Sequence, residues 1–507
     1  MLILYNPPSN AQRKPILPMS LLALGALLEG QHDYRIVDGN LADNPLAALE
    51  RAIDETGADI LGVTVMPGPQ LNDAVPTCRA LKARHPDLTV IWGGYFPTQH
   101  WEACLRAPYV DYVVRGHGEV VFKALLDTLR RGDAPTALPG LAFRWPSTTN
   151  HSPFPNSPFP IHHSPTSPPP APLPHPDHLP DWPYHRVDVP RYIRRTFMGQ
   201  RTLTHHSSYG CPFFCNFCAV VNMVNGRWLA QSAERVASTV QMAVQRWGVD
   251  AVEFDDNNFF TSEARVAEFA ERIVSLGLRI GWWGEARIDT VMHYSDSTWE
   301  LMRDSGLKMV FLGAESGSDE TLQRMNKGGK ASTAKTLEIA AKMARYGIVP
   351  EMSFVLGNPP DPEADVRQTM AFIRQVKQIN PQTEIILYMY TPVPLAGELY
   401  EQAKAEGFQF PETLEEWISP AWRDFSQRRS ATMPWVQDPL RRRLHDFERV
   451  LNAYYPTATN PSLRGARRAL LKAASAWRYH LGVYDYPLEL RALHKVMAYQ
   501  RPETSGF

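Results

Sequence analysis

Short apolar runs alternate with amphipathic segments along the first part of the chain, and this alternation constrains the fold more than any other feature. In residues 1–145 the runs extend from Leu2–Tyr5 to Val110–Val114, and the segments between them have the apolar spacing of helices. Strands that alternate with helices are typical of a parallel sheet covered on both faces. We therefore predict a doubly wound, Rossmann-like α/β domain for residues 1–145, with a ligand site at the carboxyl ends of its strands.

A proline-rich stretch interrupts this pattern at residues 146–180. Its run Ser164–Pro172 contains only Ser, Pro, Thr and Ala. Proline fixes φ and lacks an amide hydrogen, so neither a helix nor a central strand is expected here. We predict an extended linker between two domains. The histidines scattered through the stretch have no regular spacing, which favours a solvated linker over a metal site.

The alternation resumes in residues 181–407, from the apolar run Arg201–His205 to the run Glu384–Tyr390. This pattern predicts a partial, TIM-like (β/α)6 barrel whose site lies at the carboxyl ends of the strands. Residues 408–507 are rich in Trp, Tyr and Arg and are predicted to form a helical C-terminal cap. Within them, Leu463–Leu481 has the pattern of a basic amphipathic helix, which lies either on a membrane surface or against the rest of the protein.

Three of the five cysteines lie close together, as Cys211, Cys215 and Cys218. Thiolates spaced C-x3-C-x2-C can bind three irons of a [4Fe-4S] cluster, and the fourth iron then stays open to a small molecule. The alternative is a tetrahedral Cys3His zinc site that includes His205 or His206, although zinc ligands usually come as two separated pairs. A disulfide would need an oxidising compartment, which nothing in the sequence indicates.

The cysteine motif, with an aromatic residue directly before its last cysteine, resembles the signature of the radical S-adenosylmethionine (SAM) superfamily. The resemblance implies that SAM binds the open iron through its amino and carboxylate groups, and that an electron from the cluster cleaves it to a 5′-deoxyadenosyl radical. Segments after the later strands resemble the family's segments in the same order, most specifically the run GAESGS at residues 313–318. The residues expected to bind SAM are Phe217, Asp255, Glu285, Arg287, Glu315, Ser316 and Gly357.

Several of these residues also have an ordinary structural interpretation. Asp255 could belong to a helix cap, because Asp and Asn favour that position. Arg287 could pair bidentately with the carboxylate of SAM, and Glu285 could accept from its ammonium group. Either residue could instead form a salt bridge between strands.

The first domain, placed ahead of such a cysteine motif, resembles the cobalamin-binding domain of B12-dependent radical SAM enzymes. Its loop 9–14 departs from many B12 proteins, because it lacks the D-x-H-x-x-G motif whose histidine binds cobalt. Many members of this branch also lack that histidine, so the domain is expected either to hold cobalamin without it or to have lost the cofactor. The residues expected to bind cobalamin are Asn6, Pro7, Asp38, Gly93, Gly94, Gly116 and Glu119, and the glycine pair could also form a simple tight turn.

The resemblance implies an oxygen-sensitive enzyme that uses a [4Fe-4S] cluster, SAM and cobalamin to transfer a methyl group to an unactivated carbon of a small molecule or secondary metabolite. An external electron donor such as flavodoxin or ferredoxin is expected as a partner. In the same branch, anaerobic Mg-protoporphyrin IX monomethyl ester cyclases perform an oxidative ring closure, which is the alternative outcome. A non-enzymatic cobalamin or metal sensor is the alternative of a different class.

Composition argues against some partners and locations. The formal net charge is -1, and this near-neutral charge counts against a nucleic-acid substrate. No apolar run reaches the roughly 18 residues that span a bilayer. The first residues read as a buried strand without the charged region of a signal peptide. Together with the few, clustered cysteines, these features predict a cytoplasmic protein.

Overall fold

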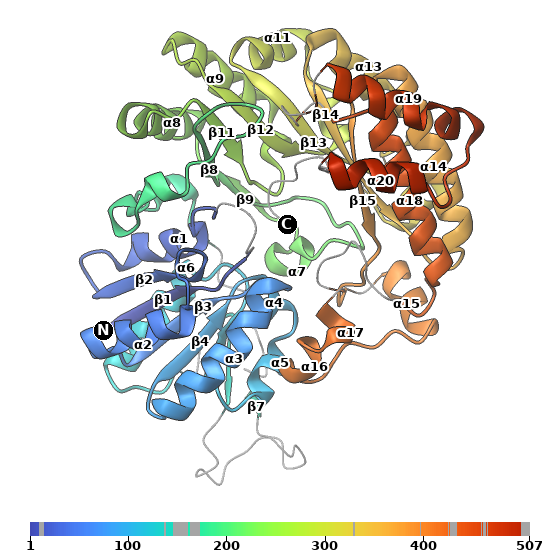
Figure 1. The fold of residues 1–507 in the computed structure, drawn as a ribbon. Helices are drawn as coiled ribbons and strands as arrows, with labels where there is room; N and C mark the ends of the chain where they lie inside the picture. Colours follow the sequence, from blue (N-terminus) through green and yellow to red (C-terminus); the bar gives the residue numbers. More distant parts are fainter. Residues whose placement is uncertain are drawn as a thin grey trace. The chain divides into compact units, whose positions relative to one another are not determined.

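The computed structural model describes residues 1–9, 15–135, 138–144, 161–162, 173–327, 330–395, 397–423, 425, 433–457, 459, 463 and 465–497. The chain forms two compact units (Figure 1). Unit 1 comprises Met1–Tyr192, Ala219–Ala230 and Gln409–Gln427, and unit 2 comprises Ile193–Cys218, Gln231–Phe408 and Arg428–Phe507.

Unit 1 is built on a sheet with strand order β2-β1-β3-β4-β5-β6-β7. The first five strands along the chain pair in parallel, whereas β6 and β7 join the edge in antiparallel orientation. The order 2-1-3-4-5 confirms the predicted doubly wound domain and places a topological switch point between β1 and β3. The strands are β1 (Leu2–Asn6), β2 (Tyr34–Asp38), β3 (Ile60–Thr64), β4 (Thr89–Gly93), β5 (Tyr112–Val114), β6 (Leu141–Arg144) and β7 (Ile161–His162).

Helices cover both faces of this sheet, and successive residues of β1 belong to different cores. Leu2 and Leu4 pack in the core that α1 and α6 cover, whereas Ile3 and Tyr5 pack in the core under α2 and α3. Burial on both faces explains why the strand reads as a continuous apolar run. The helices of the unit are α1 (Met19–Leu28), α2 (Pro45–Thr56), α3 (Pro69–Arg84), α4 (Tyr95–Gln99), α5 (Trp101–Arg106), α6 (Glu119–Arg130), α7 (Val220–Val224), α16 (Leu414–Trp417) and α17 (Pro420–Arg423), and it also holds the short strand β10 (Trp228–Ala230).

Unit 2 is built on a parallel sheet in which each strand lies beside the next one along the chain, in the order β8-β11-β12-β13-β14-β15. This topology confirms the predicted partial (β/α)6 barrel. Its main strands are β8 (Thr202–His205), β11 (Ala251–Phe254), β12 (Gly281–Ala286), β13 (Leu307–Glu315), β14 (Val349–Leu356) and β15 (Glu384–Met389), and β9 (Ser208–Gly210) is a short addition.

Five helices of unit 2 begin at a residue whose side chain caps the helix. Ser232, Ser262, Ser295, Ser332 and Asp361 each accept a hydrogen bond from the amide three residues later, which satisfies one of the unpaired donors of a helix start. The helices are α8 (Ala233–Trp247), α9 (Glu263–Ser275), α10 (Ile288–Val291), α11 (Asp296–Asp304), α12 (Asp319–Arg324), α13 (Thr333–Tyr346), α14 (Pro362–Ile379), α15 (Glu398–Ala405), α18 (Asp438–Tyr454), α19 (Ala466–Leu481) and α20 (Leu488–Val496).

The two faces of β12 show how the barrel is filled. Trp282 packs against Phe254 and Phe269 on the face that α9 covers. Its neighbour Trp283 turns to the other face, where it clusters with Met198 and Met309. Apolar side chains therefore pack on both faces of β12 at this level.

The predicted C-terminal cap is divided between the two units. Residues 409–427 belong to unit 1, where Trp417 packs edge-on against Phe96 with ring centres 5.1 Å apart. α18, α19 and α20 belong to unit 2. The aromatic residues that the sequence assigned to one cap thus serve two different cores, so the predicted boundaries at 407 and 408 do not separate compact units.

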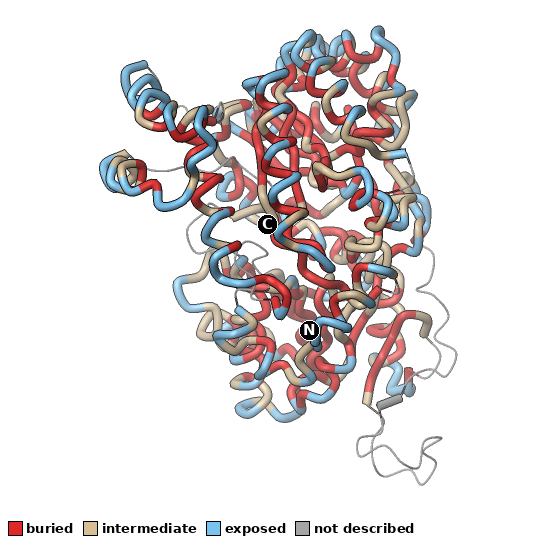
Figure 2. Tube along the Cα trace, turned by 90° about the vertical axis from the view of Figure 1, so that its right-hand side faces the viewer, coloured by how far each residue is buried: buried red, intermediate tan, exposed pale blue. Residues whose placement is uncertain are grey.

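Most of the predicted linker, residues 146–160 and 163–172, lies outside the described residues. The described helices include none that is both long and apolar enough to cross a membrane. Figure 2 shows the burial of the described chain, with buried residues concentrated along the strands of both sheets.

Candidate functional site

The carboxyl end of β8 leads into the loop that carries the three cysteines, and Asp256 holds the start of this loop. Asp256 is completely buried just after β11. It accepts hydrogen bonds from the amide of Ser207 at 2.6 Å, the hydroxyl of Ser207 at 2.6 Å and the hydroxyl of Ser208 at 2.7 Å. The second carboxylate of the Asp255-Asp256 pair is therefore a scaffold residue that fixes where the cysteine loop leaves the sheet.

A second segment, Arg324–Lys327, forms hydrogen bonds with the middle of the cysteine loop. The amide of Asn216 donates to the carbonyl of Met325 at 3.0 Å, and its side-chain amide donates to the carbonyl of Arg324 at 2.6 Å. In the other direction, the side chain of Asn326 donates to the carbonyl of Phe214 at 2.9 Å. These bonds tie the loop to the end of α12, which the sequence did not predict.

Two nitrogen donors approach the cysteine sulfurs. Arg287 donates to Sγ of Cys215 at 3.2 Å, and the side-chain amide of Asn258 lies 3.8 Å from Sγ of Cys211. The three cysteines of the motif are free thiols, and Cys215 is the most buried of them. Burial raises the pKa of the Cys211 thiol. N–H donors directed at sulfur are the contacts that stabilise cluster thiolates, so this donor set fits a cluster held by Cys211, Cys215 and Cys218.

The alternative that the sequence left open is a single zinc ion held by the cysteines and a histidine. Among the described residues, no three His, Cys, Asp or Glu side chains converge on a point where one ion could bind. Thiolates that each bind a different iron of a cluster lie farther apart than the ligands of one ion. His205, a candidate fourth ligand, is buried with its ring nitrogen 3.2 Å from the side-chain oxygen of Gln231, and this burial lowers its pKa to about 4.

Arg287 occupies the centre of the site and is already paired. Its guanidinium donates to both carboxylate oxygens of Asp289, at 3.0 and 2.8 Å, and to the carbonyl of Lys327 at 2.6 Å. Its carbon Cζ also lies 3.8 Å from the ring centre of Phe213. Arg287 therefore forms a salt bridge, which is one of the two roles that the sequence left open. Its partner Asp289 lies on the same segment and not on a neighbouring strand. A contact with the carboxylate of SAM stays a prediction.

Glu315 and Lys327 form a buried ion pair beside Arg287. Their side chains are 8% and 4% exposed, and the ammonium group of Lys327 also donates to the carbonyl of Gly313. Glu315 has a φ of 62°, in the left-handed region that few residues other than glycine adopt. Lys327 was missed by the sequence analysis, because a lysine in a loop gives no signal until its partner is known.

The rest of the GAESGS turn is packed against α14. The amide of Gly317 donates to the hydroxyl of Thr369 at 3.0 Å, and a Cβ on Gly317 would lie 2.6 Å from Cβ of Phe372. Ser316 is fully buried, and its hydroxyl accepts from the amide of Ser318 at 3.1 Å. The glycine is required by this close approach of backbone and helix.

Phe217 remains partly exposed on the cysteine loop.

Carboxylates gather at the ends of β11 and β12. Burial, together with the charges of Asp255 and Asp256, raises the pKa of Glu285 to about 8. Glu351 on β14, which the sequence analysis missed, is completely buried and accepts from the indole nitrogen of Trp283 at 2.9 Å. Burial also raises the pKa of Glu351 far above its usual range. Burial therefore makes Glu285 and Glu351 harder to ionise than an exposed carboxyl group.

Glu285→Gln is expected to change how stability depends on pH. With a pKa of about 8 in the folded state against 4.5 for the free side chain, Glu285 binds more protons when folded, so it lowers the free energy of unfolding as pH rises through this window. The free energy of unfolding of the glutamine variant should match that of the wild type near pH 4.5. Above pH 8 it should exceed the wild-type value by about 2 kcal/mol, a value discounted for solvent screening. Urea unfolding of the metal-free protein across this range measures the difference. Glu300→Gln, on the exposed side of α11, should leave the profile unchanged, and a Glu285→Gln profile parallel to the wild type would contradict the assignment.

Gly357 follows β14 in a turn organised by Asp365. The amides of Gly357 and Asn358 donate to the carboxylate of Asp365 at 2.8 and 3.1 Å. The carbonyl of Gly357 accepts from the indole of Trp435 at 2.9 Å. Gly357 has a φ of 76°, so glycine is required here. The residue predicted to contact SAM is therefore held on both sides at the end of its strand.

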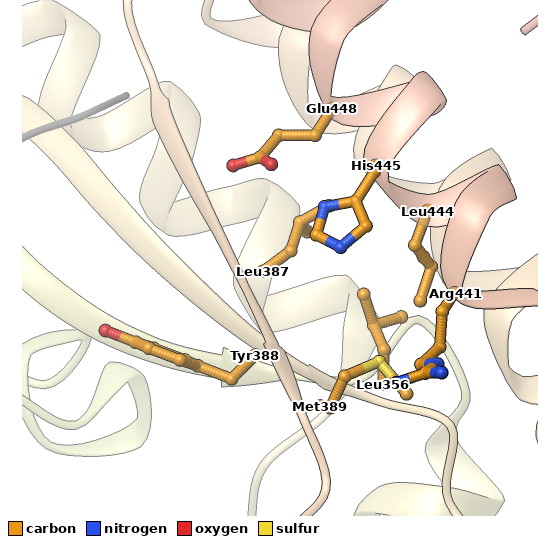
Figure 3. Close-up of a pocket in the computed structure, with 8 residues that line it drawn as sticks. All are labelled: Leu356, Leu387, Tyr388, Met389, Arg441, Leu444, His445 and Glu448. Carbon is orange, nitrogen blue, oxygen red and sulfur yellow. The ribbon is translucent and has the colours of Figure 1, made fainter. Parts of the chain in front are cut away.

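A small pocket lies next to this turn, between the ends of β14 and β15 and helix α18 (Figure 3). In Figure 3 the side chains of His445 and Glu448 project from α18 toward the strands, with Leu387 beside His445 and Leu356 next to Met389. The sequence analysis did not identify this pocket, because its polar residues come from a helix more than fifty positions beyond its strands. The lining residues are Leu356, Leu387, Tyr388, Met389, Arg441, Leu444, His445 and Glu448.

In unit 1, the residues predicted to bind cobalamin lie along one edge of the sheet. The side-chain amide of Asn6 donates to Asp38 at 3.0 Å, and Gln70 donates to the side-chain oxygen of Asn6 at 2.8 Å and to the carbonyl of Pro7 at 3.2 Å. Tyr192 donates to the second oxygen of Asp38 at 2.8 Å. This network spans the switch point between β1 and β3, where doubly wound sheets bind their ligands.

The glycines on the same edge lie at strand ends. Gly93 ends β4, and Gly94 follows it with a φ of 101°. A Cβ on Gly94 would lie 3.2 Å from both the hydroxyl of Thr64 and the amide of Val65, so glycine is required by its conformation and its neighbours. The amide of Gly116 donates to the hydroxyl of Thr98 at 3.0 Å, which joins the loop after β5 to helix α4.

Two buried polar atoms on this edge have no hydrogen-bond partner among the described residues. They are Oε2 of Glu119, at the first position of α6, and Nε of Arg115. Glu119 is 6% exposed. Buried polar atoms are rarely left without partners, so these two groups fit a polar ligand at the carboxyl edge of the sheet. Loop residues 10–14, where the cobalt-binding histidine would be expected, lie outside the described residues.

Two parts of the chain match known domain families. Residues 13–126 match the model of the B12 binding domain, and residues 206–373 match the model of the Radical SAM superfamily. The chain is 27% identical over 410 residues to an uncharacterized methyltransferase of Pyrococcus horikoshii, covering 80% of this chain and 83% of that protein. It is 26% identical over 348 residues to the anaerobic magnesium-protoporphyrin IX monomethyl ester cyclase of Synechocystis sp., covering 66% of this chain and 64% of the cyclase.

Solved structures resemble this chain over almost its whole length, and TsrM is one of them. TsrM from Kitasatospora setae, a radical S-adenosylmethionine methyltransferase determined with cobalamin and a [4Fe-4S] cluster bound, matches with a TM-score of 0.64. The match covers 98% of both chains at 18% sequence identity. At this level of identity the likeness concerns the fold.

Proposed function

Because the chain belongs to the radical SAM enzymes that carry a B12-binding domain, we propose that it transfers a methyl group from SAM to an unactivated carbon of a small molecule. In this proposal Cys211, Cys215 and Cys218 hold the cluster, unit 1 holds cobalamin, and the strand ends of unit 2 bind SAM. When bound, the cluster supplies the electron that cleaves SAM to methionine and a 5′-deoxyadenosyl radical, and cobalamin carries the methyl group.

The observation that carries the proposal is the way the cysteine loop is held. Asp256 fixes its start, the segment Arg324–Lys327 clasps its middle, and Arg287 directs an N–H group at Sγ of Cys215. A loop fixed at three points keeps its thiols in one geometry, which a cluster with one open iron requires.

The residues around the loop are proposed to position SAM. The carboxyl groups of Glu285 and Asp255 face a cationic ligand, and ionisation of Glu285 becomes favourable when an ammonium group approaches. Lys327 pairs with Glu315 and orients its carboxylate in the turn after β13. The turn at Gly357 is proposed to contact the adenine of SAM, since it lies at the same edge of the barrel.

In unit 1, the network of Asn6, Asp38 and Gln70 is proposed to line the cobalamin site. The orphaned Oε2 of Glu119 and Nε of Arg115 offer an acceptor and a donor to the polar side chains of the corrin. Methyl transfer is favoured because both the Pyrococcus horikoshii relative and TsrM bear methyltransferase names. Oxidative cyclisation remains the second candidate, since the Synechocystis relative is a cyclase.

The products of SAM distinguish these outcomes. The protein is produced with cobalamin supplied, purified and reconstituted without oxygen, reduced by flavodoxin or by a chemical reductant, and incubated with SAM. Methyl transfer predicts 5′-deoxyadenosine together with S-adenosylhomocysteine, the latter in an amount equal to the bound cobalamin even before a substrate is known. Formation of 5′-deoxyadenosine without S-adenosylhomocysteine would favour oxidative cyclisation over methyl transfer. Absence of both products would overturn the proposal.

A further inference from the structure

The residues that follow the third cysteine of the motif do not belong to the same unit as the cysteine loop. The chain leaves unit 2 after Cys218, and residues 219–230 belong to unit 1. There they begin with α7, which has Ala219 as its N-cap residue and packs against α4 (Figure 1). Ala219 is therefore joined by a single peptide bond to a candidate cluster ligand, yet it is part of the unit that contains the B12 binding domain match.

Gln99, the last residue of α4, holds this segment with both polar atoms of its side chain. Its side-chain nitrogen donates to the carbonyl of Ala219 at 3.1 Å, and its side-chain oxygen accepts from the side chain of Asn222 at 2.6 Å. An amide that donates and accepts at the same time fixes its partner segment in one orientation. The sequence analysis assigned no role to Gln99 or to Asn222.

α4 itself is bonded to the edge of the sheet that is predicted to bind cobalamin. It begins directly after Gly94, whose carbonyl accepts from the hydroxyl of Thr98 at 2.7 Å. The same hydroxyl accepts from the amide of Gly116 at 3.0 Å. Thr98 is the neighbour of Gln99 in the sequence. One short helix therefore links two of the glycines predicted to contact cobalamin to the segment that follows Cys218.

The two ends of the cysteine loop are held by different units. Asp256 of unit 2 accepts from the amide of Ser207 at the start of the loop, whereas Gln99 of unit 1 binds the residue after the last cysteine. Within the loop, the amide of Cys218 donates to the carbonyl of Cys215 at 3.1 Å. The position of the Cys218 thiol thus depends on a hydrogen bond that unit 1 supplies.

We propose that Gln99 is a positioning residue that couples cobalamin in unit 1 to the cluster loop, so that each cofactor binds more tightly when the other is present. A ligand at the edge formed by Gly94 and Gly116 restrains α4, and Gln99 passes this restraint to Ala219 and the cysteine before it. The coupling acts equally in both directions, because binding free energies at two linked sites are reciprocal. This role rests on the proposed function, in which the cysteines hold the cluster and unit 1 holds cobalamin.

The affinity for cobalamin with and without the cluster tests this role. The full-length protein is produced without cobalamin and is then either reconstituted with its cluster or freed of iron by a chelator. Binding of hydroxocobalamin is measured without oxygen by equilibrium dialysis, with cobalt determined on both sides of the membrane. The wild type is expected to bind cobalamin about fivefold or more tightly when the cluster is present, as is typical of coupled sites.

Gln99→Met keeps the length of the side chain but removes both hydrogen bonds. This variant should still bind the cluster and cobalamin, but the ratio of its two cobalamin affinities should fall to about one. Asn222→Ala removes one of the two bonds and should lower the ratio partway, and the double variant should behave like Gln99→Met alone. The matched control is Gln31→Met, at an exposed position after α1, which should keep the wild-type ratio. Circular dichroism confirms that each variant is folded.

The outcomes separate this role from the proposed function. If the wild type binds both cofactors but its cobalamin affinity does not respond to the cluster, the coupling is overturned while the proposed function stands. A Gln99→Met ratio equal to that of the wild type, or a ratio that falls as far in Gln31→Met, would overturn the role of Gln99. A wild type that binds no cobalamin or no cluster would overturn the proposed function and the coupling together.

Discussion

Cys215→Ala is expected to abolish cluster binding and to reduce cleavage of SAM to background. Cys215 is the most buried of the three thiols and accepts from Arg287 at 3.2 Å. Without Cys215 the loop offers only two thiolate ligands. Two ligands are too few to retain a [4Fe-4S] cluster in which one iron must stay open for SAM. Iron and sulfide content after anaerobic reconstitution, together with the amount of 5′-deoxyadenosine formed, measure the result.

Unfolding must be separated from loss of the ligand in this experiment. The guanidinium of Arg287 loses an acceptor in Cys215→Ala, which costs roughly 1–3 kcal/mol, so the melting temperature of the metal-free variant is compared with that of the wild type. The matched control is Cys104→Ala, which removes a buried cysteine from α5 of unit 1. It should keep a full cluster and full activity. Cluster content near the wild-type value in Cys215→Ala would contradict the assignment of this ligand.

Lys327→Met is expected to destabilise unit 2 by about 3–5 kcal/mol, because it leaves the carboxylate of Glu315 buried without its cation. Both side chains are less than one tenth exposed, so water cannot replace the lost partner. The same change is expected to weaken SAM binding, since the turn after β13 loses the group that orients it. Thermal unfolding followed by circular dichroism, and equilibrium binding of SAM to the reconstituted protein, report the two effects.

A double variant separates the charge of the pair from its packing. Glu315→Gln combined with Lys327→Met removes the unpaired charge and should recover most of the stability that Lys327→Met loses. SAM binding should not recover with it, if Glu315 has the proposed role. A Lys327→Met protein as stable as the wild type would show that the pair is not buried in solution. Recovery of both stability and SAM binding in the double variant would leave Glu315 a purely structural residue.

The fold could be predicted from the sequence because both units repeat one local pattern. Strand β1 reads as apolar throughout because both of its faces are covered, and helices such as α8 and α9 begin at a serine that caps them. These signals are local and do not depend on distant parts of the chain. The predicted doubly wound domain and partial barrel are confirmed for this reason.

The contacts that hold the candidate site could not be predicted, because they join residues distant in sequence. Lys327 and Asn326 lie in a loop without periodicity, and nothing nearby in the sequence indicates that they meet Glu315 and the cysteine loop. The ion pair of Arg287 with Asp289 is local, but the sequence does not distinguish it from the expected contact of Arg287 with SAM. Likewise, residues 409–427 look like their C-terminal neighbours in composition, yet their aromatic rings complete the core of unit 1.

The account depends most on an iron of the cluster that no protein side chain binds. Electron paramagnetic resonance of the reduced, reconstituted protein tests this claim, with spectra recorded before and after the addition of SAM. We predict the signal of a reduced [4Fe-4S] cluster that changes in shape and position when SAM is added. A cluster signal that SAM leaves unaltered, or a protein that binds stoichiometric zinc and no iron under the same conditions, would contradict it.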